Sequence, residues 1–305
     1  MTTTQITVLF GASKAGETYI SRNPGLHIIA IADNDRAKHG QTLSGIPIIH
    51  PDEIKNLKFD QLVITSLWID SIKSQLINEL GIDAGLIRVP FKHELKSNSP
   101  FAHQPTLDLA HELMVTISDY LKKNGLTPYL DSGTLLGLMR DGDLIPWDDD
   151  IDFAINEAEF NYASELMKNF KRLAPQKDNI SWHLQMISMA GENVCINIEF
   201  TPVKAGSFIP FETSLQKRRI VNGRSELVSS AGIFDAPSEH FTGNGTLKAF
   251  GHDFSTPRKP ELFLEFMYGD WCSPRKEMQL NDYDNRSIHT RTDPRSIAIT
   301  KRQLE

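Results

Sequence analysis

Short apolar segments alternate with helical or turn-rich segments throughout the first ninety residues, and this order constrains the fold of the chain most. Each apolar segment is continuously hydrophobic, which is typical of strands that are buried on both faces of a parallel sheet. Parallel strands need crossover connections, and the helical segments between them fit that need. The strands that we predict are residues 6–10, 26–33, 45–49, 61–66 and 86–90.

The turn after the first predicted strand is similar to a dinucleotide-binding fingerprint. Gly11 and Gly16 open a helix, and Asp33 follows about twenty residues later, where such folds hold a ribose hydroxyl. Ser13 stands where the middle glycine of the fingerprint belongs. Two hypotheses follow. Either these four residues bind NAD, a nucleotide or a sugar nucleotide, or the glycines only shape the turn and its contact with the helix.

The chain is long enough for two domains, and its composition changes between them. Residues 1–92 form the predicted α/β domain, which resembles the small Rossmann-like domains attached to bacterial surface-polysaccharide enzymes. The resemblance rests on the glycine turn, on the Asp-Asn-Asp at residues 33–35 and on Gly-Ile-Pro-Ile-Ile at residues 45–49. Residues 93–105 are polar and contain prolines, which predicts a linker. Residues 106–305 are then a second domain.

The acidic residues of the chain are concentrated in one segment of the second domain. The formal net charge is −7, from 39 acidic and 32 basic residues. Between Asp131 and Asp152, seven aspartates accompany a single arginine, so most of the net charge lies there. We expect no nucleic-acid partner, because such binding usually needs a basic face. The acidity instead marks a site.

Within this segment, Asp148, Asp150 and Asp152 alternate with other residues, as side chains on one face of a strand do. Three carboxylates so close together repel one another, and a bound divalent cation would relieve the repulsion. Oxygen ligands of this kind suit Mg²⁺ or Mn²⁺, whose common companion is a substrate phosphate. A purely structural acidic strand is the alternative.

A predicted helix start lies just before the aspartates. Gly133 and Thr134 would open a helix, where free backbone N–H groups attract anions and a threonine hydroxyl can donate to a phosphate oxygen. The same pair of residues is also an ordinary capping signal. Together with the aspartates on the next strand, the pair indicates a phosphate site.

The block LDSGTLLGLMRDGDLIPWDDDIDFAI, residues 130–155, resembles the signature of the LicD family. Its members include bacterial phosphocholine transferases and the fukutin and fukutin-related glycan phosphotransferases. The resemblance implies an α+β nucleotidyltransferase fold, so that the expected architecture is α/β: a Rossmann-like parallel sheet domain followed by this catalytic domain. It also implies transfer of a phosphoalcohol from a CDP-linked donor to a sugar hydroxyl with the help of a divalent metal.

The resemblance assigns roles to individual residues. Asp148, Asp150 and Asp152 would hold the metal, with Asp150 and Asp152 also counted as catalytic. Arg140 would bind substrate, unless it forms a structural ion pair with a neighbouring aspartate. The full set of expected substrate-binding residues is Gly133, Thr134, Arg140 and Trp147.

Nucleotidyltransferase-type sites usually take a third acid from a neighbouring strand. In residues 194–200, apolar residues alternate with Cys195, Asn197 and Glu199, so one face of the predicted strand is polar. Many family members carry an aspartate at the position of Asn197. We therefore expect Glu199 to be the third catalytic acid, provided that this strand pairs with the aspartate strand.

The expected partners follow from this function. They are a nucleotide-activated alcohol (choline, ribitol or glycerol phosphate) and a glycan or lipid-linked oligosaccharide acceptor of lipopolysaccharide, capsule or teichoic acid. Lys217, Arg218 and Arg219 form a basic cluster, which we expect either to be a solvated helix face or to contact phosphate or an anionic membrane. Two cysteines and the absence of a signal-like start favour the cytoplasm, with peripheral association at the inner membrane face and homo-oligomerisation left open.

Two other functions fit the same residues. A nucleotidyltransferase would attach the nucleotide itself to its target through the same metal cluster. A non-catalytic scaffold would only bind a sugar nucleotide within a polysaccharide assembly complex.

Overall fold

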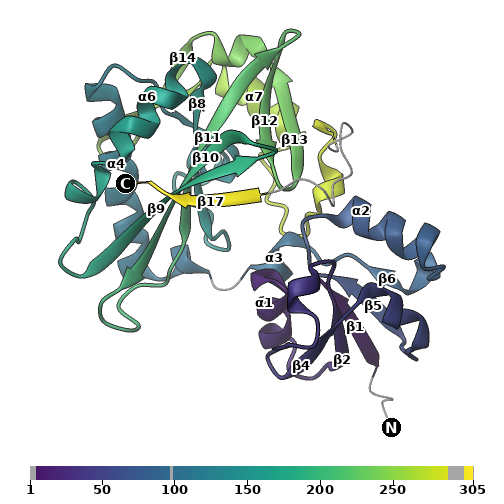
Figure 1. Ribbon diagram of the computed structural model, residues 1–305. Coiled ribbons are helices and arrows are strands. Elements are labelled where there is room, and N and C mark those ends of the chain that lie inside the picture. The colour runs from purple at the N-terminus through teal and green to yellow at the C-terminus, as the bar shows by residue number, and fades with distance from the viewer. Residues whose placement is uncertain (1–4, 97–98, 288–298, 305) are drawn as a thin grey trace. The chain divides into compact units, whose positions relative to one another are not determined.

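The computed structural model describes residues 5–96, 99–287 and 299–304 (Figure 1). These residues form two compact units. The first unit contains residues 5–96 and 275–282, and the second contains residues 99–274, 283–287 and 299–304.

The first unit is built on a six-stranded sheet in the order β3-β4-β2-β1-β5-β6. All of its neighbouring strands pair in parallel except β3 and β4, which form an antiparallel pair. The predicted α/β architecture is therefore confirmed. Its strands are β1 (Ile6–Phe10), β2 (His27–Ala32), β3 (Thr42–Leu43), β4 (Ile46–Ile49), β5 (Gln61–Ile64) and β6 (Ile87–Arg88), and its α-helices are α1 (Lys14–Arg22), α2 (Ile69–Ser74) and α3 (Lys92–Leu95).

A short segment late in the chain, residues 275–282, belongs to the first unit. The backbone N–H of Lys92 donates to the carbonyl of Met278 at 2.8 Å, and the side chain of Gln279 donates to the carbonyl of Val89 at 2.8 Å. The sequence led us to expect one continuous second domain from residue 106 onward. Backbone pairing between distant parts of a chain has no local sequence signal, so the sequence does not predict that residues 275–282 belong to the first unit.

The second unit is built on a mixed sheet whose main path runs β14-β15-β7-β8-β11-β10-β9-β17, with β12, β13 and β16 attached beside β11. The strands are β7 (Tyr129–Leu130), β8 (Asp150–Asn156), β9 (Ile180–Met189), β10 (Glu192–Pro202), β11 (Glu212–Val221), β12 (Arg224–Ser229), β13 (Gly232–Pro237), β14 (Asn244–Ala249), β15 (His252–Pro257), β16 (Arg286–Ser287) and β17 (Ile299–Gln303). The helices are α4 (Gln104–Lys123), α5 (Ser132–Arg140), α6 (Glu157–Met167) and α7 (Pro260–Tyr268).

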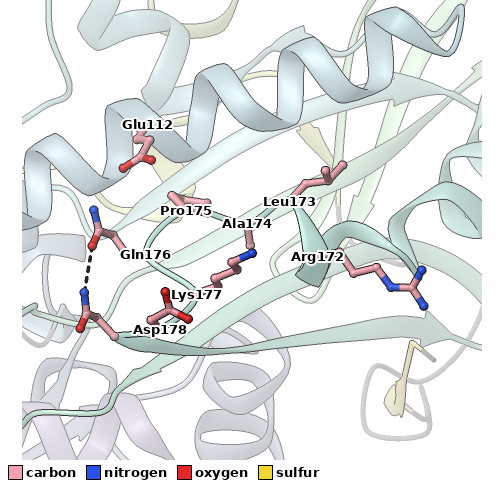
Figure 2. A pocket seen from close by; sticks show the side chains of 9 residues that line it. Glu112, Arg172, Leu173, Ala174, Pro175, Gln176, Lys177 and Asp178 are labelled. Carbon is pink, nitrogen blue, oxygen red and sulfur yellow. Dashed lines mark hydrogen bonds between the residues drawn. The ribbon is translucent and has the colours of Figure 1, made fainter.

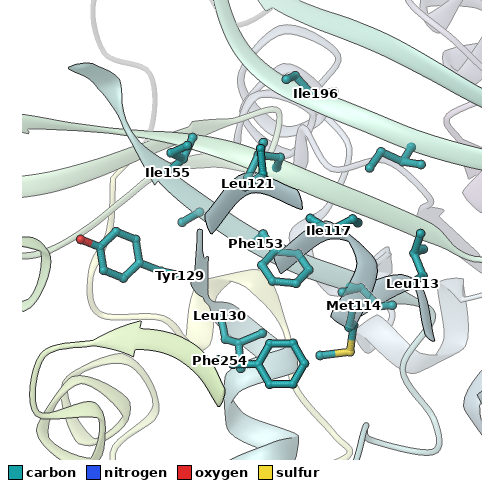
Figure 3. Close-up of a cluster of buried hydrophobic side chains, with 14 of the residues drawn as sticks. Leu113, Met114, Ile117, Leu121, Tyr129, Leu130, Phe153, Ile155, Ile196 and Phe254 are labelled. Carbon is teal, nitrogen blue, oxygen red and sulfur yellow. The ribbon is translucent and has the colours of Figure 1, made fainter. Parts of the chain in front are cut away.

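The main core of the second unit lies between helix α4 and the sheet. The buried residues of α4 recur every three or four positions, as the amphipathic pattern predicts, and include Leu113, Met114 and Ile117. They share one apolar cluster with Phe153 and Ile155 of β8 (Figure 3). Since side chains alternate along a strand, the aspartates of β8 lie on the opposite face of the sheet, away from this core.

None of the helices among the described residues is both long and apolar enough to cross a membrane.

Candidate functional site

The aspartate segment, residues 148–152, covers the turn before β8 and the first residues of that strand. Strand β8 starts at Asp150, whereas Asp148 and Asp149 lie in the preceding turn, in which the N–H of Asp148 donates to the carbonyl of Ile145 at 2.9 Å. One carboxylate oxygen from each of Asp148, Asp149 and Asp150 lies within 4.8 Å of the other two. Three carboxylates at this spacing are a suitable donor set for a hard divalent cation.

The sequence pattern had grouped Asp152, rather than Asp149, with Asp148 and Asp150. That grouping assumed that the strand already runs through Asp148, but the turn rotates Asp148 and brings Asp149 into the close group. Asp152 follows Asp150 on the same face of β8 and accepts hydrogen bonds from Ser214 Oγ at 2.7 Å and from Gln216 Nε2 at 2.8 Å.

Charge and burial act together on Asp152. Burial, followed by repulsion from Asp150, raises the pKa of Asp152 from its ordinary value of 3.8 to about 8. The hydrogen bond from Ser214 lowers the pKa, while Asp131 and Asp148 add further repulsion. The site thus has an excess of negative charge that a cation would balance.

The strand beside β8 is β11 and not, as expected, the strand that carries Glu199. In the parallel ladder between β8 and β11, Glu212 stands opposite Asp150 and Ser214 stands opposite Asp152. Strand β10, with Asn197 and Glu199, is one strand further away, on the other side of β11. The acid that stands directly opposite Asp150 on this strand is therefore Glu212.

Glu212 was not among the site residues predicted from the sequence. Its signal was an alternation of Glu212, Ser214 and Gln216 with apolar or small residues, which the following basic residues obscured. The side chain is accessible to solvent, but the atoms around the carboxyl and the charge of Glu199 raise the pKa of Glu212. A hydrogen bond from Asn197 and the positive charge of Lys301 oppose that rise.

Glu199 nevertheless lies on the same face of the sheet. Asn197 Nδ2 donates to Glu199 Oε1 at 2.9 Å and lies 3.4 Å from Glu212 Oε2, so one amide bridges the two carboxylates. The acids therefore form a continuous row across β8, β11 and β10. Glu199 lies at the far end of this row from Asp150.

Helix α5 begins directly against the aspartate turn. Asp131 caps the helix by accepting a hydrogen bond from the N–H of Ser132 at 2.8 Å. At Gly133, a Cβ atom would lie 2.5 Å from Asp148 Oδ2, too close for any side chain. Glycine at this position lets the Asp148 carboxylate approach the start of the helix, where the sequence had predicted a substrate phosphate.

Thr134 has a different position from the one that a phosphate contact requires. Its side chain is 1% exposed, and its hydroxyl oxygen accepts a hydrogen bond from the N–H of Asp152 at 2.8 Å. This bond ties α5 to β8. The geometry favours a positioning role for Thr134 over the expected contact with substrate.

The remaining two expected substrate residues lie at either end of the loop that precedes the aspartates. Arg140, in the last turn of α5, donates through Nε and Nη2 to both carboxylate oxygens of Asp141, at 2.9 and 2.7 Å. This is the structural ion pair that the sequence left open as the alternative. Trp147 is half-buried and adjoins Asp148 in the turn.

The basic cluster lies on strand β11 rather than on a helix. Arg218 is 1% exposed and donates through Nε to Asp131 Oδ2 at 2.6 Å. Its guanidinium group lies 4.4 Å from the ring centroid of Phe241. Lys217 pairs with Glu192, and Arg219 pairs with Glu226 at 3.0 Å. All three charges are therefore balanced within the protein, which is a correction to the expected solvated or membrane-contacting face.

An aromatic residue also borders the acids. Burial and the neighbouring hydroxyl of Tyr283 raise the pKa of Tyr268, and the charges of Asp131, Asp152 and Asp148 add to the effect. The ring centroids of Tyr268 and Tyr283 are 5.8 Å apart. Tyr268, at the end of α7, thus lies near the aspartates.

In the first unit, the two glycines of the fingerprint have structural roles. Gly11 has φ +120°, and a Cβ atom there would lie 2.8 Å from the carbonyl oxygen of Thr65. At Gly16, a Cβ atom would lie 2.4 Å from the carbonyl oxygen of Gly11. Ser13 occupies the N-cap position of α1, and its hydroxyl lies 3.4 Å from the carbonyl of Thr65.

The carboxylate of Asp33 also has its hydrogen-bond partners within the protein. Its Oδ2 accepts hydrogen bonds from the N–H of Ala12 at 2.8 Å and from Lys38 Nζ at 3.0 Å, while Oδ1 accepts from the N–H of Asp35 at 2.8 Å. Three of the roughly four acceptor sites of this carboxylate are therefore taken by donors of the protein itself. The geometry therefore favours the structural interpretation of Gly11, Ser13, Gly16 and Asp33.

A cavity of about 300 Å³ lies elsewhere in the second unit (Figure 2). It is lined by Glu112 of α4 and by residues 172–179. Because α4 covers the apolar face of the sheet, this cavity does not open onto the aspartates. Its lining carries acidic and basic side chains together, Glu112 and Asp178 with Arg172 and Lys177.

Two known families match separate parts of the chain. Residues 125–259 match the family described as LicD/FKTN/FKRP, nucleotidyltransferase domain, and residues 4–87 match the family described as C2185-like, N-terminal. The first match contains all of the aspartates that form the site.

Two curated relatives are uncharacterized proteins. One from Rickettsia typhi is 35% identical over 63 residues, which are 21% of this chain and 20% of that protein. One from Rickettsia prowazekii is 33% identical over 63 residues, which are 21% of this chain and 24% of that protein. The matches therefore span about a fifth to a quarter of the length of these relatives.

Among solved structures, UDP-D-quinovosamine 4-dehydrogenase from Vibrio fischeri is 20% identical and covers 29% of this chain and 79% of its own, with a TM-score of 0.25. Biliverdin reductase from Synechocystis is 10% identical and covers 92% and 94%, also with a TM-score of 0.25. Similarity at this level carries no argument about activity.

Proposed function

The domain that includes residues 125–259 belongs to the LicD/FKTN/FKRP family of nucleotidyltransferase domains, and from this premise we propose that the protein is a metal-dependent glycan phosphotransferase. It would move a phosphoalcohol from a CDP-linked donor to a sugar hydroxyl of a surface glycan. The observation that carries the proposal is the convergence of three carboxylates, Asp148, Asp149 and Asp150, at the start of helix α5.

The donor atoms suit Mg²⁺ or Mn²⁺. They are carboxylate oxygens, which hard divalent cations prefer, and two further acids, Asp152 and Glu212, adjoin them on β8 and β11. When bound, such an ion would neutralise charge on the donor pyrophosphate and on the leaving nucleotide. Asp148, Asp149 and Asp150 would hold it.

The start of helix α5 would orient the donor. The first backbone N–H groups of a helix favour anions, and the close approach of Asp148 Oδ2 to Gly133 places the carboxylate group beside this helix start. Asp131 caps the helix, and Thr134 ties it to β8 by accepting the hydrogen bond from the N–H of Asp152. A donor phosphate placed there would lie beside the carboxylate group.

A carboxylate of the acid row would accept the proton of the attacking sugar hydroxyl. Asp152 is suited to this role because it follows Asp150 on the same face of β8, beside the proposed metal ligands. Ser214 and Gln216 hold its carboxylate in place. The in-line attack then releases CMP.

The experiment is a transfer assay with CDP-choline, CDP-glycerol and CDP-ribitol as donors and surface glycan as acceptor. Wild-type protein should release CMP only with Mg²⁺ or Mn²⁺ present, and Asp150→Asn and Asp152→Asn should abolish release while keeping the fold, as circular dichroism can verify. Glu239→Gln, on an exposed residue outside the acid row, is the control. Undiminished turnover in excess chelator would refute the proposal.

The mass of the product separates the two enzymatic alternatives. Phosphoalcohol transfer adds the alcohol and one phosphate to the glycan, whereas nucleotidyl transfer leaves the nucleotide on the product. A titration in which neither Mg²⁺ nor Mn²⁺ binds would favour the non-catalytic scaffold.

A further inference from the structure

The acid row continues into a polar surface on the same face of the sheet. In the ladders, Asn197 of β10 stands opposite Gln185 of β9, and Gln185 stands opposite Gln303 of β17. Two residues further along β10, Glu199 stands opposite His183. In the other direction, Cys195 stands opposite Ile187, and Ile187 opposite Lys301. We call His183, Gln185, Ile187, Lys301 and Gln303 the β9–β17 face.

Gln185 presents an unsatisfied group on this face. Its Oε1 atom is buried and has no hydrogen-bond partner among the residues that the structure describes. A buried acceptor without a donor is unfavourable. The Gln185 side chain as a whole is partly exposed, so a rotation of its amide would present this acceptor to a ligand hydroxyl, and Ile187 beside it offers an apolar contact for a sugar ring.

Lys301 gives the face a positive charge. The other basic residues considered for substrate binding are each paired with an acid: Arg140 with Asp141, Arg218 with Asp131, and the flanking Lys217 and Arg219 with glutamates. Within the described part of the chain, Lys301 takes part in no ion pair. It is exposed, and its charge still reaches the carboxylate of Glu212.

We propose that the β9–β17 face is the acceptor subsite and binds a sugar that carries an anionic substituent, with its hydroxyls on Gln185 and Gln303 and its anionic group at Lys301. This inference rests on the proposed function, because it places the acceptor beside the acids that would take its proton. Glu199 and Glu212 would repel an anion near the metal-binding end. The anionic group must therefore lie toward β17.

The test measures sugar binding directly. Full-length protein with Mg²⁺ is titrated with methyl β-D-glucuronide and with methyl β-D-glucoside, which differ only in the carboxylate, and binding is followed by ligand-observed NMR. Wild type should bind the uronide more tightly than the glucoside. Lys301→Ala should weaken uronide binding about tenfold, down to the level of the glucoside, and leave glucoside binding unchanged.

Two further variants complete the design. Gln185→Leu keeps the size of the side chain and removes its polar group, so it should weaken both sugars. Lys248→Ala removes an exposed lysine on β14, at the opposite edge of the sheet, and should change neither. Absence of binding of both sugars to wild type, or an unchanged preference for the uronide in Lys301→Ala, would overturn the inference.

Donor binding distinguishes this inference from the proposed function. Calorimetry with CDP-choline, CDP-glycerol and CDP-ribitol in the presence of Mg²⁺ should give the same affinities for wild type, Lys301→Ala and Gln185→Leu. If wild type binds no CDP-alcohol, the proposed function fails whatever the sugars do. If a donor binds but neither sugar does, only the acceptor subsite fails.

Discussion

Glu212 stands directly opposite Asp150 in the parallel ladder between β11 and β8. This relationship makes Glu212, rather than Glu199, the acid that the adjacent strand contributes beside Asp150. We predict that Glu212→Gln lowers the affinity for Mn²⁺ by about ten- to a hundredfold, as loss of a supporting carboxylate does in other metal sites. Glu199→Gln, one strand further away, should have a smaller effect.

Calorimetric titration of both variants with Mn²⁺ checks this order, with Glu239→Gln as the control for charge alone. The reverse order would return the role of third acid to Glu199.

Gly133→Ala tests the contact between the helix start and the aspartate turn. A methyl group at this position would lie 2.5 Å from Asp148 Oδ2 and would displace that carboxylate. We expect a loss of metal affinity of at least about tenfold with little loss of fold, because alanine is otherwise favoured over glycine in a helix by up to about 1 kcal/mol. Gly25→Ala, which meets no atom within 4 Å, is the matched control. Unaltered Mn²⁺ binding by Gly133→Ala would contradict the contact.

The buried ion pair between Arg218 and Asp131 supports the base of the site. Removing the guanidinium leaves a carboxylate that is 1% exposed and has lost its charged partner. Arg218→Met should therefore lower the free energy of unfolding by about 3–5 kcal/mol, measured by urea denaturation. Arg219→Met, whose partner Glu226 is partly exposed, should lose about 1 kcal/mol or less.

The double variant Arg218→Met, Asp131→Asn should recover part of that loss, because it removes the uncompensated charge. If the two single losses simply add in the double variant, the two side chains do not act as a pair.

The stability of the metal-free protein should depend on pH through Asp152. Its pKa is raised from 3.8 to about 8, so between these values the folded state retains a proton that the unfolded state releases. Stability should consequently fall as pH rises through this window, and the penalty should be fully present above pH 8. Thermal melts in chelator from pH 5 to 9 should show a smaller slope for Asp152→Asn than for wild type. Equal slopes would exclude Asp152 as the titrating group.

In the first unit, Asp33 is expected to act on stability. Its carboxylate accepts two backbone hydrogen bonds and one from Lys38. Asp33→Ala should lower stability by about 2–3 kcal/mol because it leaves these donors unpaired. Calorimetry of the wild-type chain with NAD and UDP-sugars is the companion measurement. Tight binding that Asp33→Ala abolishes without loss of stability would restore a ligand-binding role.

The sequence predicted the local parts of the site well. The aspartate segment, the helix start at Gly133 and the apolar strands of the first unit are all encoded within short windows of sequence. In the same way, the i, i+4 pattern of α4 is local and leads directly to the core that packs on Phe153.

The order of the strands could not be predicted in this way. Strand β11 enters the sheet between β8 and β10, so Glu212 takes the place beside Asp150 that the sequence analysis gave to Glu199. The same strand explains the basic cluster. Alternation along β11 turns Arg218 inward toward Asp131, whereas a helical interpretation leaves all three basic residues in solvent.

Because residues 275–282 belong to the first unit, the order of synthesis affects how that unit folds. On the ribosome, an N-terminal domain usually folds as soon as it has emerged. Here the carbonyl of Met278, which accepts from Lys92, is synthesised almost two hundred residues later. The first unit can thus reach its complete form only after nearly the whole second unit has been translated, and an expressed fragment that ends at residue 92 would lack part of its own structure.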